Sequence, residues 1–275
     1  MVHRHPDGPA LRVREYGTSG PLVVVLHGGP GAPGYMAPVA RGLAGSFRVL
    51  EPFQRGSGGE PLTVALHVAD LHELLSSGDE RAALVGHSWG AMLALAYAAA
   101  HPRHVASLVL VGCGTFDHAA RGRLRALYEE RLNADLRRRL EGLAGEYPDP
   151  DERLGVLGRL LLRPYSCDVV EGELELEACD ARAYEETWED MIRLQEEGIY
   201  PAALAAIDAP VLMLHGAVDP HPGPLVRAGL EAHVRRLEYH EWARCGHYPW
   251  LEKAVREEFF AVLREWLLRH SPGAA

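Results

Sequence analysis

This chain of 275 residues is short of basic side chains and has no long apolar run. Its 28 lysines and arginines are outnumbered by 38 aspartates and glutamates. The resulting formal net charge of -10 argues against a nucleic-acid partner, whose phosphates require a basic face. No apolar run approaches the roughly 20 residues of a membrane-spanning helix, and residues 1–6 lack the apolar stretch of a secretory signal. We therefore expect a cytoplasmic protein with no membrane partner.

Cysteine and histidine show no metal-binding pattern. The chain has 15 histidines, yet no His-x-x-x-His or His-Glu-x-x-His motif stands on a helix-like stretch. The four cysteines show no Cys-x-x-Cys spacing, so we interpret them as reduced thiols and expect neither a metal nor a cofactor. They are Cys113, Cys167, Cys179 and Cys245.

Hydrophobic patterning predicts strands and helices in alternation. Apolar runs that are continuous or alternate with polar residues predict strands at 11–16, 22–26, 47–50, 82–85, 108–111, 211–214 and 236–240. Apolar residues at helical spacing, or strong helix formers, predict helices at 63–75, 91–100 and 252–269. Such an order implies an α/β fold with a mostly parallel sheet that helices cover on both faces.

One region interrupts the alternation. Between about residues 116 and 204 the sequence is charged and amphipathic, with no buried strand, and the sheet pattern resumes at Val211. We therefore expect a core formed by residues 1–115 and 206–275, with residues 116–205 inserted as a helical cap. The cap would cover the carboxyl edge of the sheet, where open α/β folds bind their ligands.

The segment Gly86-His-Ser-Trp-Gly90 lies between a predicted strand and a predicted helix. A serine in a G-x-S-x-G turn of this kind projects its hydroxyl from the sheet edge, and the glycines allow the backbone to pass itself closely. Ser88 is therefore the predicted nucleophile.

A serine nucleophile requires a base, and the base requires an acid that orients it. In this fold the chain order is serine, acid, histidine. Asp219 follows the predicted strand at 211–214 and would lie at its carboxyl end, whereas Asp208 precedes that strand and would lie at the opposite edge. Asp219 is therefore the predicted acid.

The base is expected in a loop beyond the last strand. His247 meets this requirement. His240 falls inside the strand, His270 ends the last helix, and His221 is too near Asp219 in sequence. His247 is therefore the predicted base.

Two backbone N–H groups are expected to receive the oxyanion of the tetrahedral intermediate. One belongs to Trp89, the residue after the nucleophile. The other would come from the glycine-rich loop at 28–31, where Gly29 is the best candidate. We expect His27, which precedes this loop, to hold it by hydrogen bonds.

These motifs together resemble one enzyme family. The segments His27-Gly-Gly-Pro-Gly31, Gln54-Arg-Gly-Ser-Gly58 and Ser88-Trp-Gly90, with Asp219 and Cys245-Gly-His247, are similar to the proline iminopeptidase branch of the α/β-hydrolase superfamily. The resemblance covers residues 10–112 and 205–270. It implies an α/β-hydrolase core with a helical cap, an acyl-enzyme mechanism without a cofactor, and release of an N-terminal residue from small peptides.

The chain also departs from that family's pattern. Phe53 stands where the family has aspartate, and His87 where it has glycine. The cap is shorter than the family's usual one. Glutamates of the family's cap bind the free amino group of the substrate, and the resemblance makes Glu189 the nearest match, with Glu196 and Glu197 as fallbacks. All three could instead be solvated helix carboxylates.

The substrate remains open between two enzyme classes. An aminopeptidase of the proline iminopeptidase type needs carboxylates facing the bound amine, whereas a carboxylesterase acting on a small ester, thioester or lactone needs an apolar pocket. Haloalkane dehalogenases and epoxide hydrolases need an aspartate where Ser88 stands. A non-catalytic ligand-binding member of the fold is a third possibility, and it predicts a damaged triad.

Overall fold

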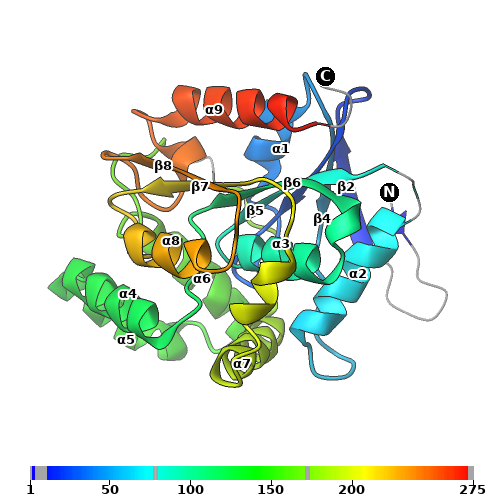
Figure 1. Ribbon diagram of the computed structural model, residues 1–275. Helices are drawn as coiled ribbons and strands as arrows, with labels where there is room; N and C mark the ends of the chain where they lie inside the picture. The colour runs from blue at the N-terminus through cyan, green and yellow to red at the C-terminus, as the bar shows by residue number, and fades with distance from the viewer. Residues whose placement is uncertain (1, 4–10, 77, 79, 171–173, 272–275) are drawn as a thin grey trace.

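The computed structural model of the chain describes residues 2–3, 11–76, 78, 80–170 and 174–271. Within these residues, eight strands form one sheet in the order β1-β2-β4-β3-β5-β6-β7-β8 (Figure 1). The strands are β1 (Val2–His3), β2 (Leu11–Tyr16), β3 (Leu22–Leu26), β4 (Arg48–Pro52), β5 (Ala82–His87), β6 (Val105–Val111), β7 (Val211–Gly216) and β8 (Leu237–Trp242).

The six strands from β4 to β8 in this order pair in parallel, and β2 pairs antiparallel with both β1 and β4. The sheet is therefore mostly parallel, as predicted, and every strand expected from the sequence is present. The short β1 was not predicted. Strands β3, β5 and β6 lie in the middle of the sheet, which is why their apolar runs are continuous.

Helices cover both faces of the sheet (Figure 1). Helices α1 (Ala37–Leu43) and α9 (Arg256–Arg269) pack on one face, and α2 (Val64–Ser76), α3 (Trp89–Ala100) and α8 (Gly223–Glu231) on the other. Each face has its own apolar core. Short 3-10 helices follow α3, precede β7 and precede α9; they are η1 (Pro102–His104), η2 (Ala202–Ala206) and η3 (Pro249–Leu251).

The start of the last helix differs from the prediction, because α9 begins at Arg256 and not at Glu252. Glu252 is almost fully buried, and its carboxylate accepts hydrogen bonds from three backbone N–H groups. Cys167 and Asp168 donate over 2.7 Å each, and Gly246 over 2.8 Å. This side chain thus ties the segment after α6 to the loop before η3. It does not begin a helix.

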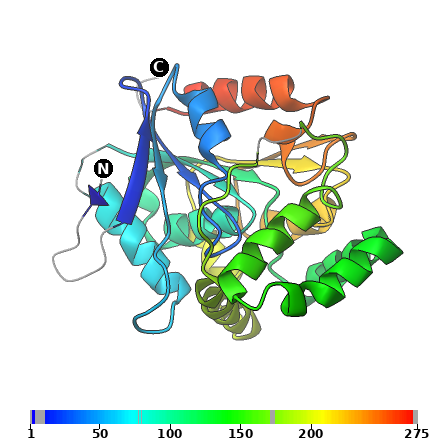
Figure 2. The same ribbon diagram turned by 180° about the vertical axis from the view of Figure 1, so that it is seen from behind.

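Four helices lie between β6 and β7 in the chain. They are α4 (His118–Arg131), α5 (Ala134–Glu146), α6 (Pro150–Leu162) and α7 (Ala181–Glu196). Each is directly preceded by an Asp or Asn whose side chain accepts a hydrogen bond from a backbone N–H of the first turn, which stabilises these polar helices. They lie on the side of the molecule away from α9 (Figures 1 and 2). Within the described ranges, none of the helices is both long and apolar enough to cross a bilayer.

Candidate active site

The turn between β5 and α3 holds Ser88 in a strained conformation. Its φ is 54°, and among the described non-glycine residues it alone has a positive φ. A Cβ on Gly86 would lie 2.2 Å from the Gly90 carbonyl oxygen, and one on Gly90 would lie 2.3 Å from that of Leu26. The turn therefore requires glycine on both sides of Ser88, which is the physical reason for the G-x-S-x-G pattern. The Ser88 N–H donates to the Val111 carbonyl over 2.9 Å, and this bond ties the turn to β6.

Asp219 and His247 meet beyond the carboxyl ends of β7 and β8. The Nδ1 atom of His247 hydrogen-bonds Oδ2 of Asp219 over 2.6 Å, and both side chains are buried. Backbone bonds fix the two loops: the Val218 N–H donates to the Cys245 carbonyl over 2.9 Å, and the His247 N–H donates to the Tyr165 carbonyl over 2.7 Å. This is the arrangement that an acid orienting a base requires.

Three imidazoles surround the Asp219 carboxylate. His221 donates to Oδ1 from its backbone N–H over 2.8 Å and from Nδ1 over 3.0 Å, and Nε2 of His215 lies 3.6 Å from Oδ2. Burial acts to raise the pKa of Asp219, but the His247, His221 and His215 rings outweigh it and hold that pKa well below its usual value. Burial lowers the pKa of His247, although Asp219 opposes the effect. Asp219 is therefore ionised and His247 neutral, the states that a general base and its orienting acid need.

The carboxylate group and two of these rings also have the composition of a metal site. Asp219, His221 and His247 each offer one ligand atom, and these atoms lie within 4.8 Å of one another. The same three side chains already hydrogen-bond one another, because both imidazoles bond to the Asp219 carboxylate. A metal ion bound here would have to replace the bond that orients His247.

Gln54 joins the two segments that are predicted to receive an oxyanion. Its Nε2 donates to the His27 carbonyl over 2.8 Å, and its Oε1 accepts from the indole N–H of Trp89 over 2.8 Å. Its backbone N–H donates to Nε2 of His27 over 3.2 Å. His27 thus takes part in holding the loop, as expected. Gly29, two residues further along this loop, has a φ of 47°. Gly29 and Ser88 line the same pocket, and Trp89 is the first residue of α3.

The pocket that contains Ser88 and His247 has a volume of about 270 Å³. Its wall is mostly apolar and aromatic, and its polar side-chain groups are hydroxyl, imidazole and indole groups. As far as the described residues go, no Asp, Glu, Lys or Arg side chain lines it. Leucines from α4, α6 and the segment before α7 form much of this wall; they are Leu124, Leu154, Leu157, Leu161, Leu174 and Leu176.

Glu189, which the resemblance suggested as a substrate-binding residue, is not among the described residues that line this pocket. Glu189 is exposed on α7, whereas the neighbouring Trp188 lines the pocket. Glu196 and Glu197, at the end of α7, are also exposed, and Glu197 pairs with Arg193.

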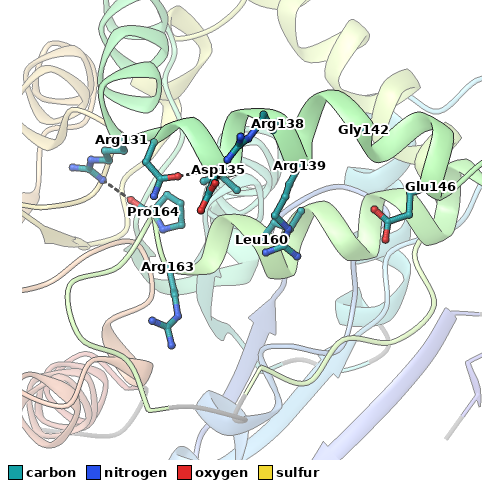
Figure 3. Close-up of a pocket in the computed structure, with 11 residues that line it drawn as sticks. Arg131, Asp135, Arg138, Arg139, Gly142, Glu146, Leu160, Arg163 and Pro164 are labelled. Carbon is teal, nitrogen blue, oxygen red and sulfur yellow. Dashed lines mark hydrogen bonds and ion pairs between the residues drawn. The ribbon is translucent and has the colours of Figure 1, made fainter.

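A second and larger cavity, of about 750 Å³, lies between α5 and α6 (Figure 3). It contains none of the predicted site residues. Its arginines are partly engaged with their neighbours: Arg138 pairs with Asp135, and Arg131 donates to the Pro164 carbonyl over 3.1 Å. The pocket at Ser88 is therefore the candidate active site.

Two further residues shape the site and were not predicted. Gly112, directly after β6, has a φ of 52°, and a Cβ there would lie 2.8 Å from Nδ1 of His247 and 3.2 Å from Oδ2 of Asp219. Its position at the carboxyl end of a buried strand was the available signal. His221 was set aside because it is close to Asp219 in sequence, yet that closeness lets it share the carboxylate and stack on His247, with 4.5 Å between ring centroids.

Comparison with known proteins places the chain in a family. A model of the alpha/beta hydrolase family matches residues 23–261, and the chain belongs to that family. A curated relative, 2-hydroxymuconate semialdehyde hydrolase of Pseudomonas sp. (strain CF600), is 27% identical over 283 aligned residues, which cover 98% of this chain and 93% of the relative. The relatives are hydrolytic enzymes, and this chain is a hydrolase of the same superfamily.

Solved structures show the same fold. The proline iminopeptidase of Mycobacterium smegmatis is 20% identical, with a TM-score of 0.65 and coverage of 98% of both chains. A thermophilic esterase from Thermogutta terrifontis is also 20% identical, with a TM-score of 0.65 and coverage of 99% of both chains. The predicted α/β-hydrolase fold is thereby confirmed, and a proline iminopeptidase is among the structures that resemble it.

Proposed function

We propose that this hydrolase cleaves small esters with an apolar acyl group through an acyl-enzyme on Ser88. The observation that carries the proposal is the charge-free pocket around Ser88 and His247. Transfer of an apolar acyl chain from water to such a wall is favourable, because it removes apolar surface from water. A charged group would lose its hydration there without a partner of opposite charge.

In the proposed mechanism His247 takes the proton of Ser88 while the hydroxyl oxygen attacks the ester carbonyl. Asp219 accepts the Nδ1–H of His247, which keeps Nε2 free to act as base and stabilises the imidazolium that forms. The N–H groups of Gly29 and Trp89 receive the oxyanion. His247 then gives its proton to the leaving alcohol, and water activated by the same ring hydrolyses the acyl-enzyme.

Residues 116–205 act in this proposal as a cap over the pocket. Helices α4, α6 and α7 contribute side chains to the wall, including Leu124, Leu161 and Trp188. The core contributes Ser88 and His247. Substrate selection would therefore come from the cap and chemistry from the core.

The second candidate is an aminopeptidase of the proline iminopeptidase type. The motif resemblance and the similar Mycobacterium smegmatis structure favour it. Recognition of a free amino group needs a carboxylate, and Glu189 is not placed to supply one. The pocket therefore favours the ester.

A matched set of substrates tests the proposal. We expect p-nitrophenyl butyrate to be cleaved at least about 100-fold faster, as kcat/KM, than mono-p-nitrophenyl succinate, because the succinyl carboxylate would be buried without a partner. We expect little cleavage of prolyl 4-nitroanilide. Preference for the prolyl anilide, or equal rates on the two esters, would refute the substrate assignment.

Ser88→Ala is the control for the mechanism. It should lower kcat on the butyrate ester by at least about 10³-fold without loss of fold. Retained activity would refute the role of Ser88 for either substrate class.

A further inference from the structure

His87, immediately before Ser88, is buried and hydrogen-bonded at both ring nitrogens. Its Nδ1 lies 2.8 Å from the Tyr35 hydroxyl, and its Nε2 lies 2.9 Å from the His247 carbonyl oxygen. The Tyr35 hydroxyl in turn accepts a hydrogen bond from the Gly28 N–H over 2.6 Å. The proposed mechanism uses neither side chain, although both line the pocket.

The donor and acceptor of each of these three hydrogen bonds follow from the chemistry of the groups. A carbonyl oxygen only accepts, so Nε2 of His87 must carry the hydrogen. Burial holds the pKa of His87 well below its usual value, so the ring is neutral and Nδ1 is an acceptor. The Tyr35 hydroxyl must then donate to Nδ1, which leaves its oxygen free to accept from Gly28. The three bonds therefore run without conflict from Gly28 through Tyr35 and His87 to the His247 carbonyl.

The surrounding rings hold His87 in place. Its centroid is 4.4 Å from that of His247 and 4.8 Å from that of Trp250, which meets it edge to face. Tyr35 stacks on Trp250 at 6.3 Å. Both His87 and Trp250 are almost fully buried. An alternative rotamer would have to displace these rings, and close packing makes that costly.

The three hydrogen bonds connect the glycine loop on one side of the nucleophile to the His247 loop on the other. Gly28 precedes Gly29, the proposed oxyanion donor, and a Cβ on Gly28 would lie 2.7 Å from the Ser88 Cβ. The other end is the backbone of His247, the proposed base. A shift of either end changes the distance between the oxyanion donor and the base.

We propose that Tyr35 and His87 form a positioning bridge that fixes the glycine loop carrying Gly29 relative to the loop carrying His247. The proposal rests on the proposed roles of Gly29, Ser88 and His247. It gives a reason for histidine at position 87. The glycine that the related family has there lacks a side chain and could bond neither Tyr35 nor the His247 carbonyl.

Single and double substitutions test the Tyr35–His87 bridge. Tyr35→Phe removes the hydroxyl and leaves the ring. His87→Gln places an amide N–H near the position of Nε2, which can still donate to the His247 carbonyl, but it loses the acceptor for Tyr35. Each variant breaks the same link, so we expect kcat on p-nitrophenyl butyrate to fall about 10-fold or more in each, with KM little changed.

The double variant provides the decisive comparison. Because the link is already broken in Tyr35→Phe, adding His87→Gln should lower kcat little further. His87→Asn added to Tyr35→Phe should lower it more, because asparagine is too short to reach the His247 carbonyl. Fold losses that simply multiply in the double variant with Gln, or a single variant with wild-type kcat, would overturn the proposal.

The control is Tyr97→Phe in α3. Tyr97 is fully buried, and its hydroxyl has no hydrogen-bond partner among the described residues. The change therefore removes the same atoms from a buried tyrosine far from the reaction, and kcat should not change. Rates are measured well below each variant's Tm, so that loss of kcat is not loss of fold. Activity surviving in Ser88→Ala would refute the proposed function instead, which keeps the two failures distinct.

Discussion

Replacing Gly112 with alanine probes how closely the chain must approach the Asp219–His247 pair. The added Cβ would lie 2.8 Å from Nδ1 of His247 and 3.2 Å from Oδ2 of Asp219, where ordinary contacts begin at 3.4 Å. Both atoms take part in the 2.6 Å hydrogen bond that orients the base. The added methyl group therefore crowds both atoms of this hydrogen bond.

The size of the effect follows from these distances. The imidazole must retreat by about 0.6 Å to restore contact, and a misplacement of about 1 Å costs on the order of 10²-fold in rate. We expect kcat/KM of Gly112→Ala to fall about 10- to 100-fold on p-nitrophenyl butyrate. The φ of 52° adds a strain of about 1–2 kcal/mol for a residue with a Cβ, so the free energy of unfolding should fall by a similar amount.

Steady-state kinetics and urea denaturation measure the two effects separately. Gly122→Ala is the matched control, because Gly122 lies in α4 with nothing within 4 Å of a built Cβ. It should keep wild-type kcat/KM and gain up to about 1 kcal/mol of stability from helix propensity. If Gly112→Ala loses stability but keeps kcat/KM, the close approach to His247 does not matter for catalysis, and the reasoning fails.

Two pH effects follow from the buried histidines. Burial lowers the pKa of His247 below 6.5, and only the neutral ring can act as base, so kcat/KM should fall only as the pH drops below 6.5; an acid limb centred above pH 6.5 would contradict this. Burial likewise lowers the pKa of His27 to about 4, while the unfolded chain titrates near 6.5. Between these values the unfolded state binds the extra proton, so stability should decline as the pH falls from about 6.5 to about 4, by about 3 kcal/mol for this residue. The urea midpoint of His27→Gln should depend less steeply on pH in that window, and equal slopes in the two proteins would refute the assignment.

The sheet could be predicted from the sequence because its central strands are buried on both faces. Runs such as 22–26 and 108–111 allow few other interpretations. The turn at Ser88 was equally clear, since its two glycines are required by backbone contacts that involve only neighbouring elements. The start of α9 at Arg256 could not be predicted, because Glu252 is held by N–H groups from the distant segment at 167–168.

Side-chain direction in the helices between β6 and β7 was the least predictable property. Trp188 and Glu189 are adjacent in an aromatic-rich segment, and the sequence does not show which of them faces the pocket. That depends on how α7 is rotated against the core. The same limit applied to His221, whose ring stacks on His247 through a turn that has no periodic pattern.

The contacts of the segment at 165–170 determine where an engineer could exchange helices between members of the family. The Tyr165 carbonyl accepts from the His247 N–H, and the Val170 N–H donates to the Leu251 carbonyl over 2.8 Å. Between them, the Cys167 and Asp168 N–H groups donate to Glu252. This stretch follows α6 in the chain, but it is bonded to the loop that carries the base. A graft of α4, α5 and α6 that ends before Tyr165 exchanges Leu124, Leu154, Leu157 and Leu161 of the pocket wall and leaves those bonds in place. A graft that runs past Tyr165 also replaces the backbone segment that is bonded to the loop of His247.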